Sequence, residues 1–124
     1  MRQRRERRGA YWTKGMTMVA ASELTAMTEV ERRLLYLFLF DHAEWQISEL
    51  CAAMRSKIGR YTYDIPPTKC IESCESLCAK GLLRRSFEPK TPKSKRYASL
   101  GSKLSLDAAR LLLGEAVRKD WVVG

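Results

Sequence analysis

The sequence has little that would build an enzyme active site. Its one histidine, His42, follows an expected helix and has no serine or cysteine motif beside it. Paired acidic signatures and a phosphate-binding glycine loop are also missing, although acid–base and nucleotide chemistry depend on such patterns. We therefore expect the chain not to be an enzyme and to need no cofactor.

Long apolar runs are absent as well. The longest aromatic and aliphatic run, residues 34–40, has seven residues, whereas a membrane helix needs about 20. The apolar stretch after the first arginines is too weak for a signal peptide. The four cysteines form no C-x-x-C pair, which argues against a secreted disulfide framework. We expect a cytoplasmic protein that makes no membrane contact.

Three of the cysteines, Cys70, Cys74 and Cys78, recur every four residues. On a helix they would span roughly 12 Å, since each residue rises about 1.5 Å. A zinc ion holds its sulfur ligands at about 2.3 Å, so one ion could not bind all three without breaking the helix. The spacing favours a core role for these thiols over a metal site or a redox switch, and we expect no metal.

Positive charge is abundant and unevenly placed. The formal net charge is +9, with a surplus of basic residues in 1–14 and in 55–103 and an acidic surplus in 15–54. Two basic blocks around an acidic one are typical of a protein with one face toward a polyanion. This pattern favours a nucleic-acid partner, and an ordinary basic surface without one stays open.

The first 14 residues predict a flexible basic arm, because they carry no periodic apolar face. The arm could follow phosphates or enter a minor groove, or it could be a solubilising tail, and both interpretations stay open. Its arginines are Arg2, Arg4, Arg5, Arg7 and Arg8. Residues 15–27 form a poorly defined lead-in, in which Ser22–Leu24 can start a short helical turn.

Two helices are expected next. Thr28 and Glu31 form a capping box that starts a helix ending near Asp41, with Arg32 and Arg33 pointing outward. A short strand at 45–47 then precedes a second helix, which Ser48 can cap.

A third helix is expected at about 68–80. Pro66 and Pro67 come before it, Cys70, Cys74 and Leu77 form its apolar stripe, and Gly81 ends it. Residues 82–88 and 96–100 read as two strands joined by the turn-rich loop 89–95. The ending L-x-x-K-G-L-L-R-R resembles the third helix and first wing strand of winged helix-turn-helix DNA-binding domains.

The resemblance implies an α+β, mostly helical fold with a two-stranded β-hairpin wing, spanning about residues 28–103. In that family the third helix lies in the DNA major groove. The outward residues proposed to contact bases are Thr68, Lys69, Ser73 and Ser76. The cations proposed to hold the DNA backbone are Arg84, Arg85, Lys90, Lys93, Lys95 and Arg96.

The sequence departs from the family between the second and third helices, where residues 55–65 replace a short turn. This insertion is basic and aromatic, and its candidate contact residues are Arg55, Lys57, Arg60 and Tyr61. A role in phosphate contact and stacking and a role as an ordinary surface loop both stay open.

Residues 104–124 are expected to form an additional carboxy-terminal helix, capped by Ser105, and a tail. Helices in this position form the dimer interface in many small winged-helix regulators, so we expect a homodimer. A monomer in which the helix folds back on the domain stays open. The stripe proposed for the interface is Leu106, Ala109, Leu113, Val117 and Trp121.

The sequence as a whole predicts a double-stranded DNA-binding protein, a small prokaryotic or phage-type transcriptional repressor that blocks a promoter. Two alternatives stay open. One is a replication or partition protein with the same fold. The other is a winged-helix module with a protein partner, such as a phage-encoded inhibitor of a host nucleic-acid machine, which Glu72 and Glu75 on the third helix would favour.

Overall fold

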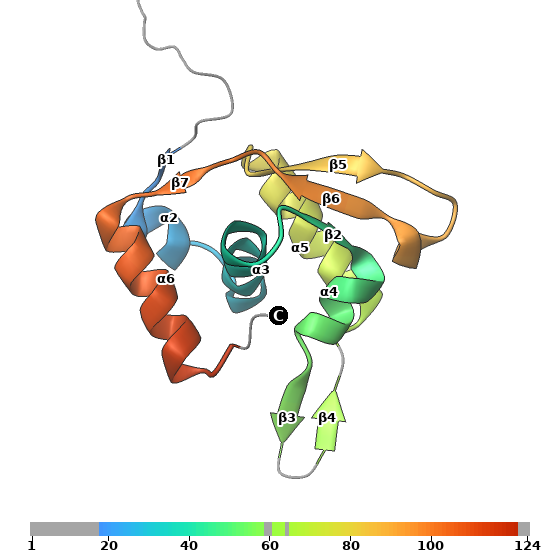
Figure 1. Cartoon of the computed structure of the whole chain (residues 1–124), viewed down its shortest axis with the longest axis horizontal. Helices are drawn as coiled ribbons and strands as arrows, with labels where there is room; N and C mark the ends of the chain where they lie inside the picture. Colours follow the sequence, from blue (N-terminus) through green and yellow to red (C-terminus); the bar gives the residue numbers. More distant parts are fainter. Residues whose placement is uncertain (1–17, 59–60, 64, 122–124) are drawn as a thin grey trace, which may run out of the picture.

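The computed structural model describes residues 18–58, 61–63 and 65–121, and this part of the chain has an α+β fold (Figure 1). The elements follow in the order β1 (Met18–Val19), α2 (Ala21–Thr25), α3 (Glu29–Phe40), β2 (Glu44–Gln46), α4 (Ile47–Ala53), β3 (Ser56–Ile58), β4 (Tyr61–Tyr63), α5 (Pro67–Ala79), β5 (Leu83–Phe87), the 3-10 turn η1 (Pro92–Ser94), β6 (Arg96–Ser99), β7 (Lys103–Leu104) and α6 (Leu106–Arg118).

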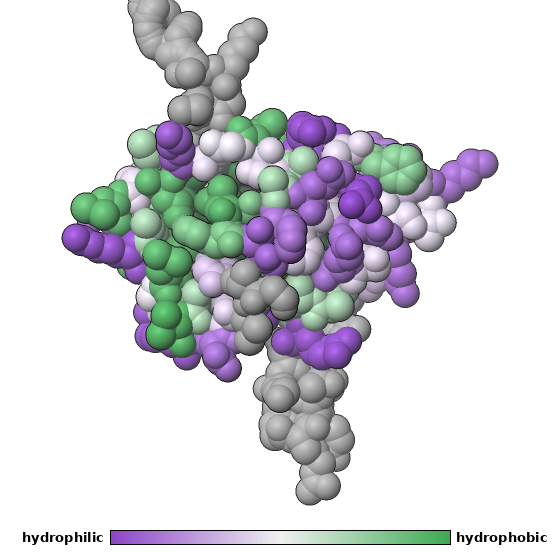
Figure 2. Space-filling model, in the orientation of Figure 1, coloured by the Kyte–Doolittle hydropathy of each residue, from purple (hydrophilic) through white to green (hydrophobic). Residues whose placement is uncertain are grey.

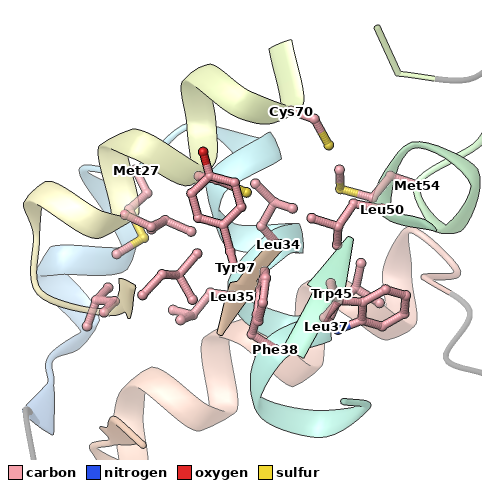
Figure 3. Close-up of a cluster of buried hydrophobic side chains, with 14 of the residues drawn as sticks. Met27, Leu34, Leu35, Leu37, Phe38, Trp45, Leu50, Met54, Cys70 and Tyr97 are labelled. Atoms are coloured by element: carbon pink, nitrogen blue, oxygen red, sulfur yellow. The ribbon is translucent and has the colours of Figure 1, made fainter. Parts of the chain in front are cut away.

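Helix α3 is the centre of the hydrophobic core (Figures 1 and 3). The predicted capping box starts it: the Glu31 amide donates to Thr28 Oγ1 at 3.2 Å, and the Thr28 amide donates to Glu31 Oε1 at 2.8 Å. Its apolar face then packs among the other helices, with Leu34 and Leu37 almost fully buried. The sequence prediction for this helix is confirmed.

The outward positions predicted for Arg32 and Arg33 are wrong, because α6 and α4 pack over that side of α3. Arg32 donates to both carboxylate oxygens of Glu115 on α6, at 2.6 and 3.0 Å. Arg33 donates to the last carbonyls of α4, and its guanidinium lies 6.0 Å from the ring centroid of Trp121. Both arginines therefore join helices instead of facing solvent.

A three-stranded antiparallel sheet closes one side of the core, with the strand order β2-β6-β5. The short strand β2 confirms the prediction of a strand before the second helix. Trp45 lies opposite Tyr97, and both side chains are buried on the core face of the sheet. Helix α4 begins one residue before Ser48, and Glu49 takes the capping role by accepting from the Gln46 amide at 2.8 Å.

The insertion between the second and third helices contains an antiparallel hairpin, β3–β4, instead of an irregular loop. In Figure 1 the hairpin projects away from the three-stranded sheet and from α6. The sequence did not predict it, since this mixture of basic, aromatic and polar residues is compatible with both a strand and a loop.

Helix α5 occupies 67–79, close to the predicted span, and has Pro66 as its N-cap. Its apolar stripe is buried as predicted: Cys70, Cys74 and Leu77 are inaccessible to solvent. Gly81 follows with a φ of 77°, in the left-handed region that a residue with a β-carbon rarely adopts.

Helix α6 belongs to the same core and is not a separate tail. Ser105 caps it as predicted, accepting from the Ala108 amide at 3.1 Å. Its inner face, formed by Ala108, Leu112 and Ala116, packs against α2 and α3. The parallel pairing of β1 with β7 joins the predicted lead-in to this end of the molecule.

Replacing Thr28 by alanine should lower the free energy of unfolding by about 1 kcal/mol, because the first turn of α3 loses its side-chain acceptor. Thr68 provides the control, since it is exposed near the start of α5 and caps nothing. Urea denaturation should show a loss for Thr28→Ala and none for Thr68→Ala. Equal stability of the two variants would contradict the capping role.

Candidate nucleic-acid interface

The hairpin formed by β5, η1 and β6 carries exposed basic side chains of the candidate site. Lys90 and Lys93 lie exposed in its loop, and among the described residues neither makes an ion pair. Pro89 and Pro92 restrict the backbone of the loop. In Figure 1 this loop extends beyond the three-stranded sheet at the end opposite α6.

Two of the predicted wing cations are already paired within the protein. Lys95 is half-buried, and its ammonium lies 3.1 Å from Glu88. Arg96 donates to Glu44 at 3.1 Å and to Gln46 at 3.0 Å. These two residues are therefore less available to phosphate than the sequence predicted.

Arg85 is held by a carboxylate at the centre of the site. Two of its three guanidinium nitrogens, Nε and Nη2, donate to Glu75 on α5, and the Nε–Oε2 distance is 2.9 Å. The buried Tyr97 hydroxyl donates to the same Oε2 at 2.6 Å. Hydrogen bonding from Arg85, together with that from Tyr97, outweighs partial burial and holds the pKa of Glu75 below its ordinary value. This cluster joins α5 to β5 and β6.

Arg84, the neighbour of Arg85, points the other way. It lies opposite Ala98 and is exposed. Hydrogen bonds from Ser86 and Arg96 lower the pKa of Glu44, and the charge of Arg84 adds to this effect. The two arginines thus lie on opposite faces of the sheet, as strand alternation requires.

The expected outward positions of Ser73 and Ser76 on α5 are wrong. Ser73 is only 6% exposed, because it belongs to the same buried side as Cys70 and Leu77. Ser76 is half-buried, and its hydroxyl donates to Glu31 on α3, which also accepts from Lys80 at 3.3 Å. Neither serine is placed to read a base edge.

The amino end of α5 is open. Thr68 and Lys69 are exposed as predicted, no side chain caps this end, and the first turn contains no acidic residue. Glu72 follows on the outward face with 76% of its side chain exposed and lies 3.9 Å from the Lys69 ammonium. The accessible face of α5 is therefore basic at its start and acidic further along.

Several predicted contacts lie outside the described residues. They are the arm residues Arg2, Arg4, Arg5, Arg7 and Arg8, together with Arg60 and the side chains of Lys57 and Tyr61. Arg55 is described and exposed at the base of the β3–β4 hairpin.

The stripe predicted for a dimer interface is exposed on α6 at Leu106, Leu113 and Val117, whereas Ala109 is half-buried. Leu106 is 68% exposed, Val117 is 81% exposed, and Leu113 lies between them. Figure 2 shows apolar residues gathered on the side where Figure 1 draws α6. Trp121 is instead buried, with its ring 5.7 Å from that of Tyr36, so its assignment to the interface is wrong.

The cysteines pack as the sequence predicted. Burial, assisted by the neighbouring Cys51, strongly raises the pKa of the Cys70 thiol, and burial does the same for Cys74. Among the described residues, no group of three or more histidine, cysteine or acidic side chains is arranged to hold a metal. No described helix is long and apolar enough to cross a membrane.

The sequence singled out Glu75 only as an acidic residue of the third helix that would favour a protein partner, and it did not predict the contacts with Arg85 and Tyr97. Ten residues separate Glu75 from Arg85, and 22 separate it from Tyr97. The only available signal was the glutamate itself, since an acidic residue on a proposed DNA-contacting helix invites a search for a basic partner.

Comparisons with family models, with characterised proteins and with solved structures returned no significant match to this chain.

Replacing Glu75 by glutamine should lower stability in a pH-dependent way. The pKa of Glu75 is depressed in the folded protein, so its ionised form stabilises the fold above 4.5, and this contribution is lost as the pH falls through the depressed value. Urea denaturation at several pH values should show a wild-type advantage at neutral pH that disappears in acid. The exposed control Glu72→Gln should have nearly the same free energy of unfolding as the wild type at every pH. An advantage that persists unchanged in acid would contradict the ion-pair account.

Proposed function

We propose that this chain binds double-stranded DNA through the loop of the β5–β6 hairpin and the amino end of α5, as a small transcriptional repressor. The observation that carries the proposal is the arrangement of α5 and the hairpin. A helix packed on α3 and α4 leads directly into an antiparallel hairpin whose loop presents exposed lysines. The order of elements from α3 to β6 supports a winged helix-turn-helix fold.

Electrostatics favours phosphate contact at two places. Lys90 and Lys93 are exposed and lie outside ion pairs in the described structure, so binding DNA would not require breaking an internal contact. The uncapped amino end of α5 offers backbone N–H groups and the positive end of the helix dipole. Thr68 and Lys69 at that end are the residues we propose to reach base edges.

A protein partner is the second candidate, and it is favoured by the exposed Glu72. Its side chain is 76% exposed on the outward face of α5, with the Lys69 ammonium 3.9 Å away. A carboxylate on this face is unfavourable near phosphates, although glutamate can accept from a cytosine amino group. A basic partner protein that loses affinity when Glu72 becomes lysine would support this alternative.

We also propose that the DNA-binding form is a dimer joined through α6. An exposed stripe of leucine and valine is costly in a monomer, since each fully buried side chain of this size gains about 1.5–3 kcal/mol. Asp107 and Arg118 are 11 residues apart, about three helical turns, so they flank the stripe on the same side. In an antiparallel pair each Asp107 would face Arg118 of the other copy, which makes the surface complementary to itself.

Changing both Lys90 and Lys93 to alanine should weaken binding to random-sequence duplex DNA and lower the salt dependence. Two lost phosphate contacts reduce the slope of log K against log salt by about 1.8. Lys103→Glu is a control with the same change in net charge on β7, away from the hairpin. Fluorescence anisotropy across a salt series should show the smaller slope only for the hairpin variant. Equal slopes for the two variants would remove the hairpin from the interface.

Replacing both Leu106 and Val117 by lysine should shift the protein from dimer to monomer in sedimentation equilibrium. Ala52→Lys, on the exposed side of α4, should leave the dimer intact. The charge pattern has its own test: Asp107→Arg should weaken the dimer, and adding Arg118→Asp should restore it. A monomeric wild-type protein at micromolar concentration would contradict the proposed interface.

A further inference from the structure

Strand β5 contains an irregularity that changes the direction of one aromatic side chain. Arg85 lies opposite Tyr97, but Phe87 lies opposite the adjacent Arg96, so β5 has one extra residue at this point. In a regular strand Phe87 would share the face of Arg85, which packs toward α5. A bulge re-aims the side chains that follow it. Phe87 is therefore turned to the other face of the sheet, and it is 53% exposed.

The surroundings of Phe87 on this face are polar and fixed. Its cross-strand neighbour Arg96 is anchored by Glu44 and Gln46, and Ser86 donates to the same Glu44 at 2.8 Å. Beside this network, the ring of Phe87 is a flat apolar surface that the protein leaves about half uncovered. Leaving a phenylalanine so exposed forgoes part of the free energy that its burial would provide.

Phe87 is also isolated from the other exposed apolar residues. Within the described part of the chain, it is the only large exposed hydrophobic side chain on the β2-β6-β5 sheet, whereas several others gather on α6. Lys90 and Lys93 follow it in the loop, and Arg84 precedes it on the strand. The cores of protein interfaces are depleted in charge and rich in neighbouring apolar groups. Phe87 instead has charged neighbours and no other large exposed apolar side chain on its sheet among the described residues.

A nucleotide with an unpaired base suits these groups. Its base has a π face that can stack on a phenylalanine, and its phosphates carry the charge that the loop lysines attract. A fully paired duplex offers its base faces only at an end or a kinked step. The combination of a single ring with adjacent cations is typical of stacking sites for unpaired bases.

We propose that Phe87 is a stacking residue for an unpaired base at a junction between duplex and single-stranded DNA. The proposal rests on the DNA binding proposed above and deepens it. Lys90 and Lys93 hold the phosphates of the junction, and the bulge in β5 presents the ring to the base that leaves the duplex. The protein accordingly prefers DNA with unpaired nucleotides over blunt duplex.

The test compares three linear, two-stranded DNAs that share one duplex: a blunt one, one with a short single-stranded tail, and one whose tail consists of abasic nucleotides. The abasic tail keeps the phosphates and removes the bases. Full-length wild-type protein should bind the normal tail about tenfold more tightly than the abasic tail. This ratio corresponds to the free energy gained when one base stacks on an aromatic ring. Fluorescence anisotropy at constant salt measures the three affinities.

Variants at Phe87 separate stacking from general apolar contact. Phe87→Ala and Phe87→Leu should lose the preference for the normal tail, while Phe87→Trp should keep it, and blunt-duplex affinity should stay unchanged in all three. Phe40→Ala is the matched control, because Phe40 is 45% exposed on α3 and should not affect the preference. Thermal denaturation confirms that each variant is folded.

The possible failures are distinct. Duplex binding with equal affinity for normal and abasic tails overturns the stacking role and leaves the proposed DNA binding intact. A preference that survives in Phe87→Ala also overturns the assignment to Phe87. Absence of binding to all three DNAs overturns the proposed function together with this inference.

Discussion

The carboxylate of Glu75 is the contact on which the geometry of the candidate site depends. It accepts hydrogen bonds from Tyr97 on β6 and from Arg85 on β5, so one side chain of α5 is bonded to both hairpin strands. Tyr97 is fully buried, and its hydroxyl would lose its acceptor if the carboxylate moved, which costs about 1–3 kcal/mol. The loop with Lys90 and Lys93 is thereby held at a defined position relative to the amino end of α5.

The same contact shapes the electrostatics of the proposed interface. Glu75 and Arg85 neutralise each other, and Arg96 is likewise paired with Glu44. The exposed positive charge is therefore concentrated in the hairpin loop and at the start of α5, and the middle of that helix is neutral or acidic. DNA bound in this way would be held mainly by its backbone, with few base edges within reach. Phe87 would then add a preference for unpaired structure rather than for sequence.

The sequence predicted the elements whose signals are local. The Thr28–Glu31 capping box, the cap at Ser105 and the stripe of Cys70, Cys74 and Leu77 each lie within one or two helical turns, and the structure contains all three. Features that depend on distant partners could not be predicted. Arg32 forms an ion pair with Glu115, which is 83 residues away in the sequence. Ser73 is buried because of the way α5 packs against α3 and α4. The bulge that turns Phe87 outward arises from pairing with β6 and leaves no local signal.

The most direct test of duplex DNA binding through the hairpin is to map backbone amide chemical shifts while random-sequence duplex is added to isotope-labelled protein. Our account predicts that the largest changes fall in residues 89–95 and at Thr68 and Lys69, and that the exposed face around Glu72 changes little. Changes confined to α6 or to the middle of α5, or no change at all, would contradict the proposal that this surface binds DNA.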